Sequence, residues 1–300
     1  MAIAVADAVA AGFTLIRRRP GSVLIWGLMR TLYSCCSLAL IAPMFLARVR
    51  EILSRARDGV PPDPASLSGL HGANLLLSFA GALVAAVMSC AVFRAVLKPE
   101  EGKWAYLRIG SAELFLFLLT IGLVVTAAVG AFLVAIPLIM ITLVAALAHA
   151  QAAAAIIAIV GVIGLLAVLC WVFLRLSMAG PMMVEDGKFH LGDAWGLTRG
   201  HAADLFVIAA SLFIVLLVIE VVIGAFTVAV GLATLGHVAG GLAALHGFLV
   251  RPPAEILAGV APGVIVLGLV AIPVFGCLSA IIAAPWANAY RDLTRGGTAP

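Results

Sequence analysis

Long apolar runs separated by short polar stretches make up almost the whole chain. About 20 apolar residues in an α-helix are enough to cross a lipid bilayer, and these runs are at least that long. We therefore predict an all-α polytopic membrane protein, in which a bundle of six transmembrane helices forms a single domain over residues 1–300. The predicted spans are residues 22–46, 74–97, 114–146, 152–178, 205–235 and 256–284.

The third and fourth spans come from one apolar run that is too long for a single crossing. Two long spans joined by a hairpin are the simplest arrangement that accounts for its length. His149 and Gln151 offer the polar turn near its middle. We expect the hairpin there.

Two polar loops on one side of the bundle are predicted to contain short interfacial helices. After the fourth span, Leu191, Ala194 and Trp195 recur at the spacing of one helical face. The loop after the second span begins with Pro99 and two acidic residues, which is typical of a helix start, and it contains Trp104. Because a tryptophan ring favours the headgroup region, both segments should lie along the membrane surface.

The N-terminal segment, residues 1–20, is mildly amphipathic and ends in Arg17, Arg18 and Arg19. A secretory signal peptide carries its positive charges before the apolar region, whereas here they follow it. We therefore predict an interfacial N-terminal helix that is not cleaved.

Basic and aromatic residues gather on the side of the bundle that carries both predicted termini. Because cytoplasmic loops are enriched in Lys and Arg, we expect both termini to be cytoplasmic. The basic residues on this side are Arg17, Arg18, Arg19, Arg94, Lys98, Lys103, Arg108, Arg175, Lys188, Arg199, Arg291 and Arg295, against Arg48, Arg50, Arg55, Arg57 and Arg251 on the other. The candidate cytoplasmic interface consists of Arg94, Trp104, Arg175, Pro181, Trp195, Arg199, Trp286 and Tyr290.

The composition excludes a soluble protein. Hydrophobic residues make up 64% of the chain, charged residues 11%, and the mean hydropathy is +1.22. Soluble domains carry about a quarter charged residues. The net charge of +4 is too diffuse to predict nucleic-acid binding and fits contact with anionic lipids. We expect membrane lipids as partners and no nucleic acid. The cytoplasmic loops are a candidate site for a protein partner.

Three segments carry a family resemblance: IRRRPGSVLIWG near the start, RLSMAGPMMVEDGKFHLGDAWGLTRG, and APWANAYRDL near the end. With them the chain resembles uncharacterised bacterial six-span proteins that are similar to the membrane domain of some glycerophosphoryl diester phosphodiesterases. The resemblance implies an integral protein of the bacterial inner membrane. It transfers no catalytic residues, and the phosphodiesterase catalytic domain is absent from this chain.

The sequence contains no recognisable catalytic motif. HExxH, GxSxG and a Gly-rich phosphate loop followed by Lys and Ser or Thr are all missing. The five cysteines lie in apolar runs without a CxxC spacing, so we interpret them as small core residues. His190 and His201 share a loop with several acids, and solvated interfacial groups explain them better than a metal site does. We expect no enzyme activity, no metal and no cofactor.

Arg30 and Glu220 are the charged residues that lie deepest in the apolar runs. A charge near the bilayer centre costs at least about 2.5 to 3.5 kcal/mol unless it is paired or hydrated. The two residues are therefore a candidate intramembrane polar pair. In the alternative, Arg30 extends toward the interface and Glu220 is protonated.

Three functions are weighed against these patterns, and the third is an enzyme without a recognisable motif. The missing aromatic belt and the apolar hairpins on the outer side favour a protein that handles or transports lipid or a small amphiphile. The alternative is a non-catalytic structural or assembly protein whose cytoplasmic loops dock a partner. Ion conduction is disfavoured because only two ionisable groups lie deep in the spans.

Overall fold

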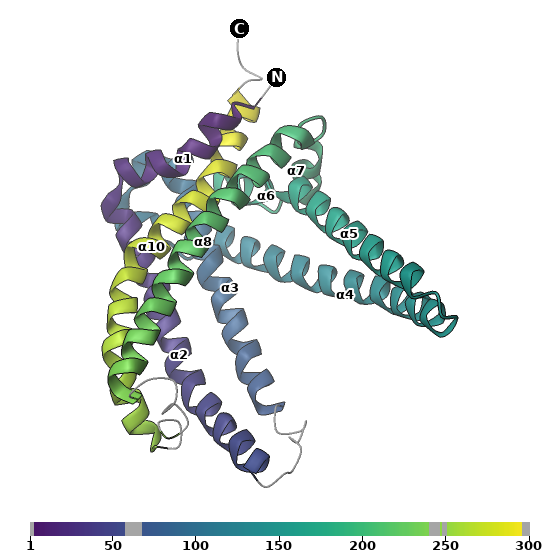
Figure 1. The fold of residues 1–300 in the computed structure, drawn as a ribbon. Helices are drawn as coiled ribbons and strands as arrows, with labels where there is room; N and C mark the ends of the chain where they lie inside the picture. The colour runs from purple at the N-terminus through teal and green to yellow at the C-terminus, as the bar shows by residue number, and fades with distance from the viewer. Residues whose placement is uncertain (1–2, 58–67, 240–246, 248–250, 296–300) are drawn as a thin grey trace.

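Six long α-helices dominate the computed structural model, which describes residues 3–57, 68–239, 247 and 251–295 (Figure 1). These residues contain no strand, and 6 helices are long and apolar enough to cross a membrane. The all-α class and the multi-pass membrane architecture are thus confirmed. The long helices are α2 (Pro20–Arg57), α3 (Ser68–Leu97), α4 (Ser111–Leu147), α5 (Gln151–Leu176), α8 (Ala202–Ala239) and α10 (Pro253–Arg295).

The short elements lie at the end of the bundle where both termini are found (Figure 1). We call this end the terminal side and the opposite end the hairpin side. The amphipathic helix α1 packs against α10, two 3₁₀ turns join α3 to α4, and two short helices join α5 to α8. The short elements are α1 (Val5–Arg18), η2 (Pro99–Glu101), η3 (Lys103–Tyr106), α6 (Ala179–Asp186) and α7 (Leu191–Leu197).

The predicted local structure of the connections is confirmed in two places and wrong in one. The turn between α4 and α5 lies at His149, and α7 covers the helix predicted from Leu191 to Trp195. The loop after α3 is not an α-helix, because Trp104, Ala105 and Tyr106 all adopt left-handed backbone angles. The apolar connection between the fifth and sixth spans lies largely outside the described residues.

The buried core lies at the terminal side. The wholly buried side chains include Trp26, Tyr106 and Met178, which come from three different parts of the chain. Toward the hairpin side, α4 and α5 form a hairpin that diverges from the other long helices (Figure 1). Phe132 and Leu133 on α4 are 67% and 66% exposed there. Because the solvent at this depth is lipid, such apolar surface is compatible with a stable fold.

Two glycines bring the backbones of α2 and α10 into direct contact. A Cβ atom at Gly27 would lie 1.7 Å from the carbonyl oxygen of Ile272, and one at Gly276 would lie 2.1 Å from that of Val23. No larger residue fits either position without separating the helices. Small residues that allow close backbone approach are typical of helix contacts in membranes.

Replacement of either glycine by alanine should destabilise the protein. We expect Gly27→Ala or Gly276→Ala to lower the free energy of unfolding by about 1 to 3 kcal/mol or more, because a backbone clash cannot be relieved by a side-chain rotation. Thermal unfolding in detergent measures the effect.

The matched controls are Gly21→Ala on α2 and Gly268→Ala on α10, where a Cβ meets nothing within 4 Å. These two substitutions should leave stability unchanged or raise it, since alanine favours the helix. If Gly27→Ala is as stable as Gly21→Ala, the close contact between α2 and α10 is wrong.

Candidate functional site

A buried ion pair joins α3 to α4 at the terminal side. The Arg94 guanidinium contacts the Glu113 carboxylate, and the two residues are only 7% and 1% exposed. The Glu113 carboxylate also accepts a hydrogen bond from the Gly110 N–H at 3.0 Å, while Arg94 donates to the Tyr106 carbonyl at 3.3 Å. Arg94 was predicted at the interface from its place in the sequence, but the structure places it in the core.

The turn next to this pair is strained. Trp104, Ala105 and Tyr106 have φ angles of 51°, 54° and 64°, in a region that costs non-glycine residues about 1 to 2 kcal/mol each. The Trp26 indole N–H holds the turn by donating to the Ala105 carbonyl at 2.8 Å, in a buried bond. The Tyr106 hydroxyl donates to the Pro99 carbonyl at 3.0 Å. Packing at the terminal side therefore overrides the local backbone preference.

A second set of contacts fixes α6 against α3 and α10. The Lys98 ammonium donates to the carbonyls of Val184 and Glu185 at 3.2 and 2.9 Å, which satisfies carbonyl groups at the C-terminal end of α6. The Tyr290 hydroxyl on α10 donates to the Glu185 carboxylate. These bonds connect α6 to the end of α3 and to α10.

The predicted cytoplasmic interface divides into three groups. Arg94, Pro181, Trp286 and Tyr290 are buried in the terminal-side core, so they do not form part of an exposed surface in this structure. Trp104 is 88% exposed and Arg199 is also exposed. Arg175 and Trp195 are half-buried and lie against each other. The structure therefore brings only the last two together at a surface.

The two deepest charges do not meet. In the described part of the chain, no ion pair within 4 Å joins Arg30 to Glu220, and α10 packs against both helices that carry them. The Arg30 guanidinium carbon lies 5.9 Å from the centre of the Tyr33 ring, and Glu220 is exposed on α8. The candidate intramembrane pair is thus not formed in this structure.

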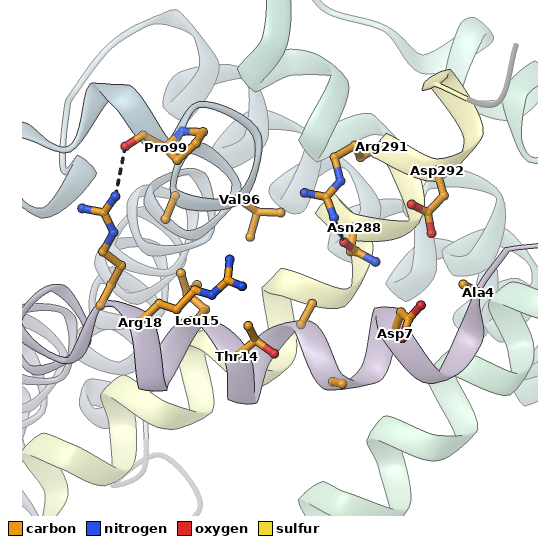
Figure 2. Close-up of a pocket in the computed structure, with 14 residues that line it drawn as sticks. Ala4, Asp7, Thr14, Leu15, Arg18, Val96, Pro99, Asn288, Arg291 and Asp292 are labelled. Carbon is orange, nitrogen blue, oxygen red and sulfur yellow. Dashed lines mark hydrogen bonds between the residues drawn. The ribbon is translucent and has the colours of Figure 1, made fainter. Parts of the chain in front are cut away.

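A polar cavity of about 620 Å³ lies at the terminal side between α1, the end of α3 and the end of α10 (Figure 2). Arg18 on α1 and Arg291 on α10 extend into it from opposite walls. Asp7 and Asp292, from the same two helices, line it as well. The cavity is lined by Ala4, Asp7, Ala10, Ala11, Thr14, Leu15, Arg18, Arg19, Ala95, Val96, Pro99, Asn288, Arg291 and Asp292.

The three arginines of the cavity differ in their hydrogen-bond partners. Arg19 donates to the Pro99 carbonyl at 3.4 Å, and Arg291 donates to the Asn288 side chain. Arg18 has no hydrogen bond or ion pair with any described residue. A guanidinium without a partner at the edge of a cavity is suited to a phosphate or carboxylate group, which it can bind through two parallel hydrogen bonds.

Sequence reasoning missed this cavity, although it named Arg18 and Arg291 as basic residues. The cluster of Arg17, Arg18 and Arg19 was interpreted only as a signal of membrane orientation. The amphipathic pattern of α1 predicts a helix at the interface with one apolar face. It does not show which helices that face contacts. The C-terminal end of α10 lies more than 270 residues away in sequence, so only the fold brings the two together.

No protein-family model, curated protein or solved structure matches this chain. The resemblance to the membrane domain of glycerophosphoryl diester phosphodiesterases therefore gains no support from these comparisons. The geometry of the terminal side is therefore the basis for inferring a function.

His190 forms a clamp between α6 and α7. Its Nδ1 atom lies 2.6 Å from the Asp193 carboxylate and its Nε2 atom lies 2.6 Å from that of Asp186. Both ring nitrogens can donate only when the imidazole is protonated. The hydrogen bonds to Asp193 and Asp186 accordingly raise the pKa of His190 above its usual value of 6.5.

This clamp predicts a pH-dependent contribution to stability. Because the pKa of His190 is raised in the folded protein, its contribution should be fully present below the unfolded pKa, near 6.5, and should be lost as pH rises through the folded pKa. The difference in melting temperature between the wild type and His190→Gln should therefore be largest near pH 6 and should shrink toward alkaline pH.

The control is His149→Asn at the hairpin side, which should not alter the pH profile. Asparagine is used there because it tolerates the left-handed backbone of His149. A stability difference between wild type and His190→Gln that stays constant from pH 6 to pH 9 would exclude the protonated clamp.

Proposed function

We propose that this protein is a non-enzymatic, multi-pass protein of the bacterial inner membrane that binds and handles lipid or a small amphiphile. The terminal side, in this proposal, faces the cytoplasm. The observation that carries the proposal is the cavity of about 620 Å³, where Arg18 and Arg291 project from two elements into one polar space.

The charges in the cavity favour an anionic or zwitterionic head group. Arg18, Arg19 and Arg291 supply positive charge to the lining of the cavity, and Asp7 and Asp292 supply negative charge. A phosphate or carboxylate would bind the arginines, and an ammonium group in the same molecule would lie near Asp7. The apolar part of the ligand would lie along the lipid-exposed helices that leave the terminal side.

A second candidate function is that of a non-catalytic assembly protein. The observation that favours it is the hairpin of α4 and α5, which diverges from the rest of the bundle (Figure 1). Ile159 and Ile163 on α5 are examples of its large exposed apolar side chains. Another membrane protein could cover this surface in place of lipid.

Binding of an amphiphile can be tested with dodecyl phosphate in a neutral detergent. A ligand that binds only the folded state adds about 2.7 kcal/mol of stability at 100 times its Kd. We expect dodecyl phosphate to raise the melting temperature of the wild type, and the double variant Arg18→Gln/Arg291→Gln to lose most of this rise. Inorganic phosphate should have a much smaller effect, because it lacks the apolar chain.

The matched control is Arg17→Gln/Arg199→Gln, which removes two exposed arginines of the same side that do not line the cavity. It should respond like the wild type. An equal response of the cavity variant and the wild type would contradict the proposal. Stoichiometric co-purification of a protein partner without bound lipid would favour the assembly function.

A further inference from the structure

A second basic site lies at the end of α5, outside the cavity. The guanidinium carbon of Arg175 lies 5.6 Å from the centre of the Trp171 ring and 5.7 Å from that of Trp195. The two rings meet edge to face at 4.9 Å. Trp171 and Arg175 belong to α5 and Trp195 to α7, so the guanidinium lies beside a pair of rings contributed by two helices.

Helix α7 is fixed in place around this arginine. Thr198 is fully buried, and its hydroxyl lies 3.2 Å from the Arg175 carbonyl and 3.1 and 3.2 Å from the carbonyls of Ala194 and Trp195, so these three acceptors share its single proton. Trp195, one helical turn before Thr198, packs edge to face on Trp171, and this ring contact places it beside Arg175. The group of Arg175, Trp171 and Trp195, which we call the arginine clamp, is preformed.

The positive charge in the arginine clamp has no counter-charge in the described parts of the chain. Its Nε and Nη1 atoms are buried and make no hydrogen bond there. No described carboxylate lies within 4 Å of the guanidinium. The ring faces offset part of the cost of removing this charge from water, but they do not provide hydrogen-bond acceptors.

We propose that the arginine clamp binds the phosphate group of a phospholipid at the surface of α5 and α7. Nε and Nη1 are the buried nitrogens of this half-buried side chain, so Nη2 is the atom that would donate to a phosphate oxygen.

The surroundings favour a lipid phosphate over a free one. Trp171 is 46% exposed, and Val168, seven residues before Arg175 and therefore on the same face of α5, is exposed as well. An acyl chain can therefore lie along α5 while the phosphate meets Arg175 at its end. Tryptophan also favours the depth of the lipid head groups.

This site does not depend on the cavity between α1, α3 and α10, because it uses different residues on different helices. The two proposals can therefore fail separately. Arg18→Gln/Arg291→Gln should keep the lipid that is bound at the arginine clamp.

The test compares the wild type with Arg175→Met after the lipid has been removed in a neutral detergent and after phosphatidylglycerol has been added back. Without lipid, Arg175→Met should be at least as stable as the wild type, because it removes a buried charge that lacks a partner. With phosphatidylglycerol, the melting temperature of the wild type should rise and that of Arg175→Met should rise by less than half as much. Native mass spectrometry should show one bound phospholipid fewer on the variant.

Two further variants make the result specific. Arg199→Met, on the exposed turn after α7, should retain the wild-type lipid response. Trp171→Leu keeps the charge of Arg175 but should lose the same bound lipid, which provides a second measurement if Arg175→Met does not fold.

Three results would overturn the proposal. Arg175→Met could retain as many phospholipids and the same rise in melting temperature as the wild type. Inorganic phosphate could stabilise the wild type as strongly as phosphatidylglycerol, which would make a free anion the ligand. Arg175→Met could also be less stable without lipid and respond normally to lipid, which would give Arg175 a purely structural role.

Discussion

The buried ion pair between Arg94 and Glu113 is the interaction on which the rest of the terminal side depends. It joins α3 to α4, and through Arg94 it also holds the carbonyl of Tyr106 in the strained turn. Trp26 on α2 binds the same turn, so three of the long helices meet at this point. Two charges in such a dry environment are stable only together, because either one alone would be left buried without compensation. The pair therefore fixes where the helices converge.

Three arginines of the terminal side have different environments and, in our account, different roles. Arg94 contacts a carboxylate and stabilises the core. Arg175 lies beside two tryptophan rings that contact each other, and Arg18 extends into the polar cavity (Figure 2). The first is satisfied by the protein, whereas the other two offer donors to an anionic group. On the hairpin side, α4 and α5 present mainly apolar surface, so the terminal side is where a charged head group can be recognised while its chain remains in lipid.

The sequence was sufficient to predict the all-α class and the six long apolar helices, because both depend on the local length and polarity of a run. The turn at His149 and the helix α7 also follow from local patterns. The environments of Arg94 and Tyr290 could not be predicted in this way. Both lie near polar loops and are of residue types that are common at membrane interfaces. Packing of α6 against α3 and α10 buries them. The cavity was missed for the same reason, since α1 and the end of α10 meet only in the folded chain.

A double-mutant cycle on Arg94 and Glu113 tests the central claim most directly. The free energy of unfolding in detergent would be measured for Arg94→Leu, Glu113→Leu and the double variant. Each single substitution should lower it by about 3 to 5 kcal/mol, because it leaves the partner charge buried and uncompensated. The double variant should recover much of the loss, so the two effects should be far from additive. Additive effects, or single variants as stable as the wild type, would contradict a terminal side that is organised around this pair.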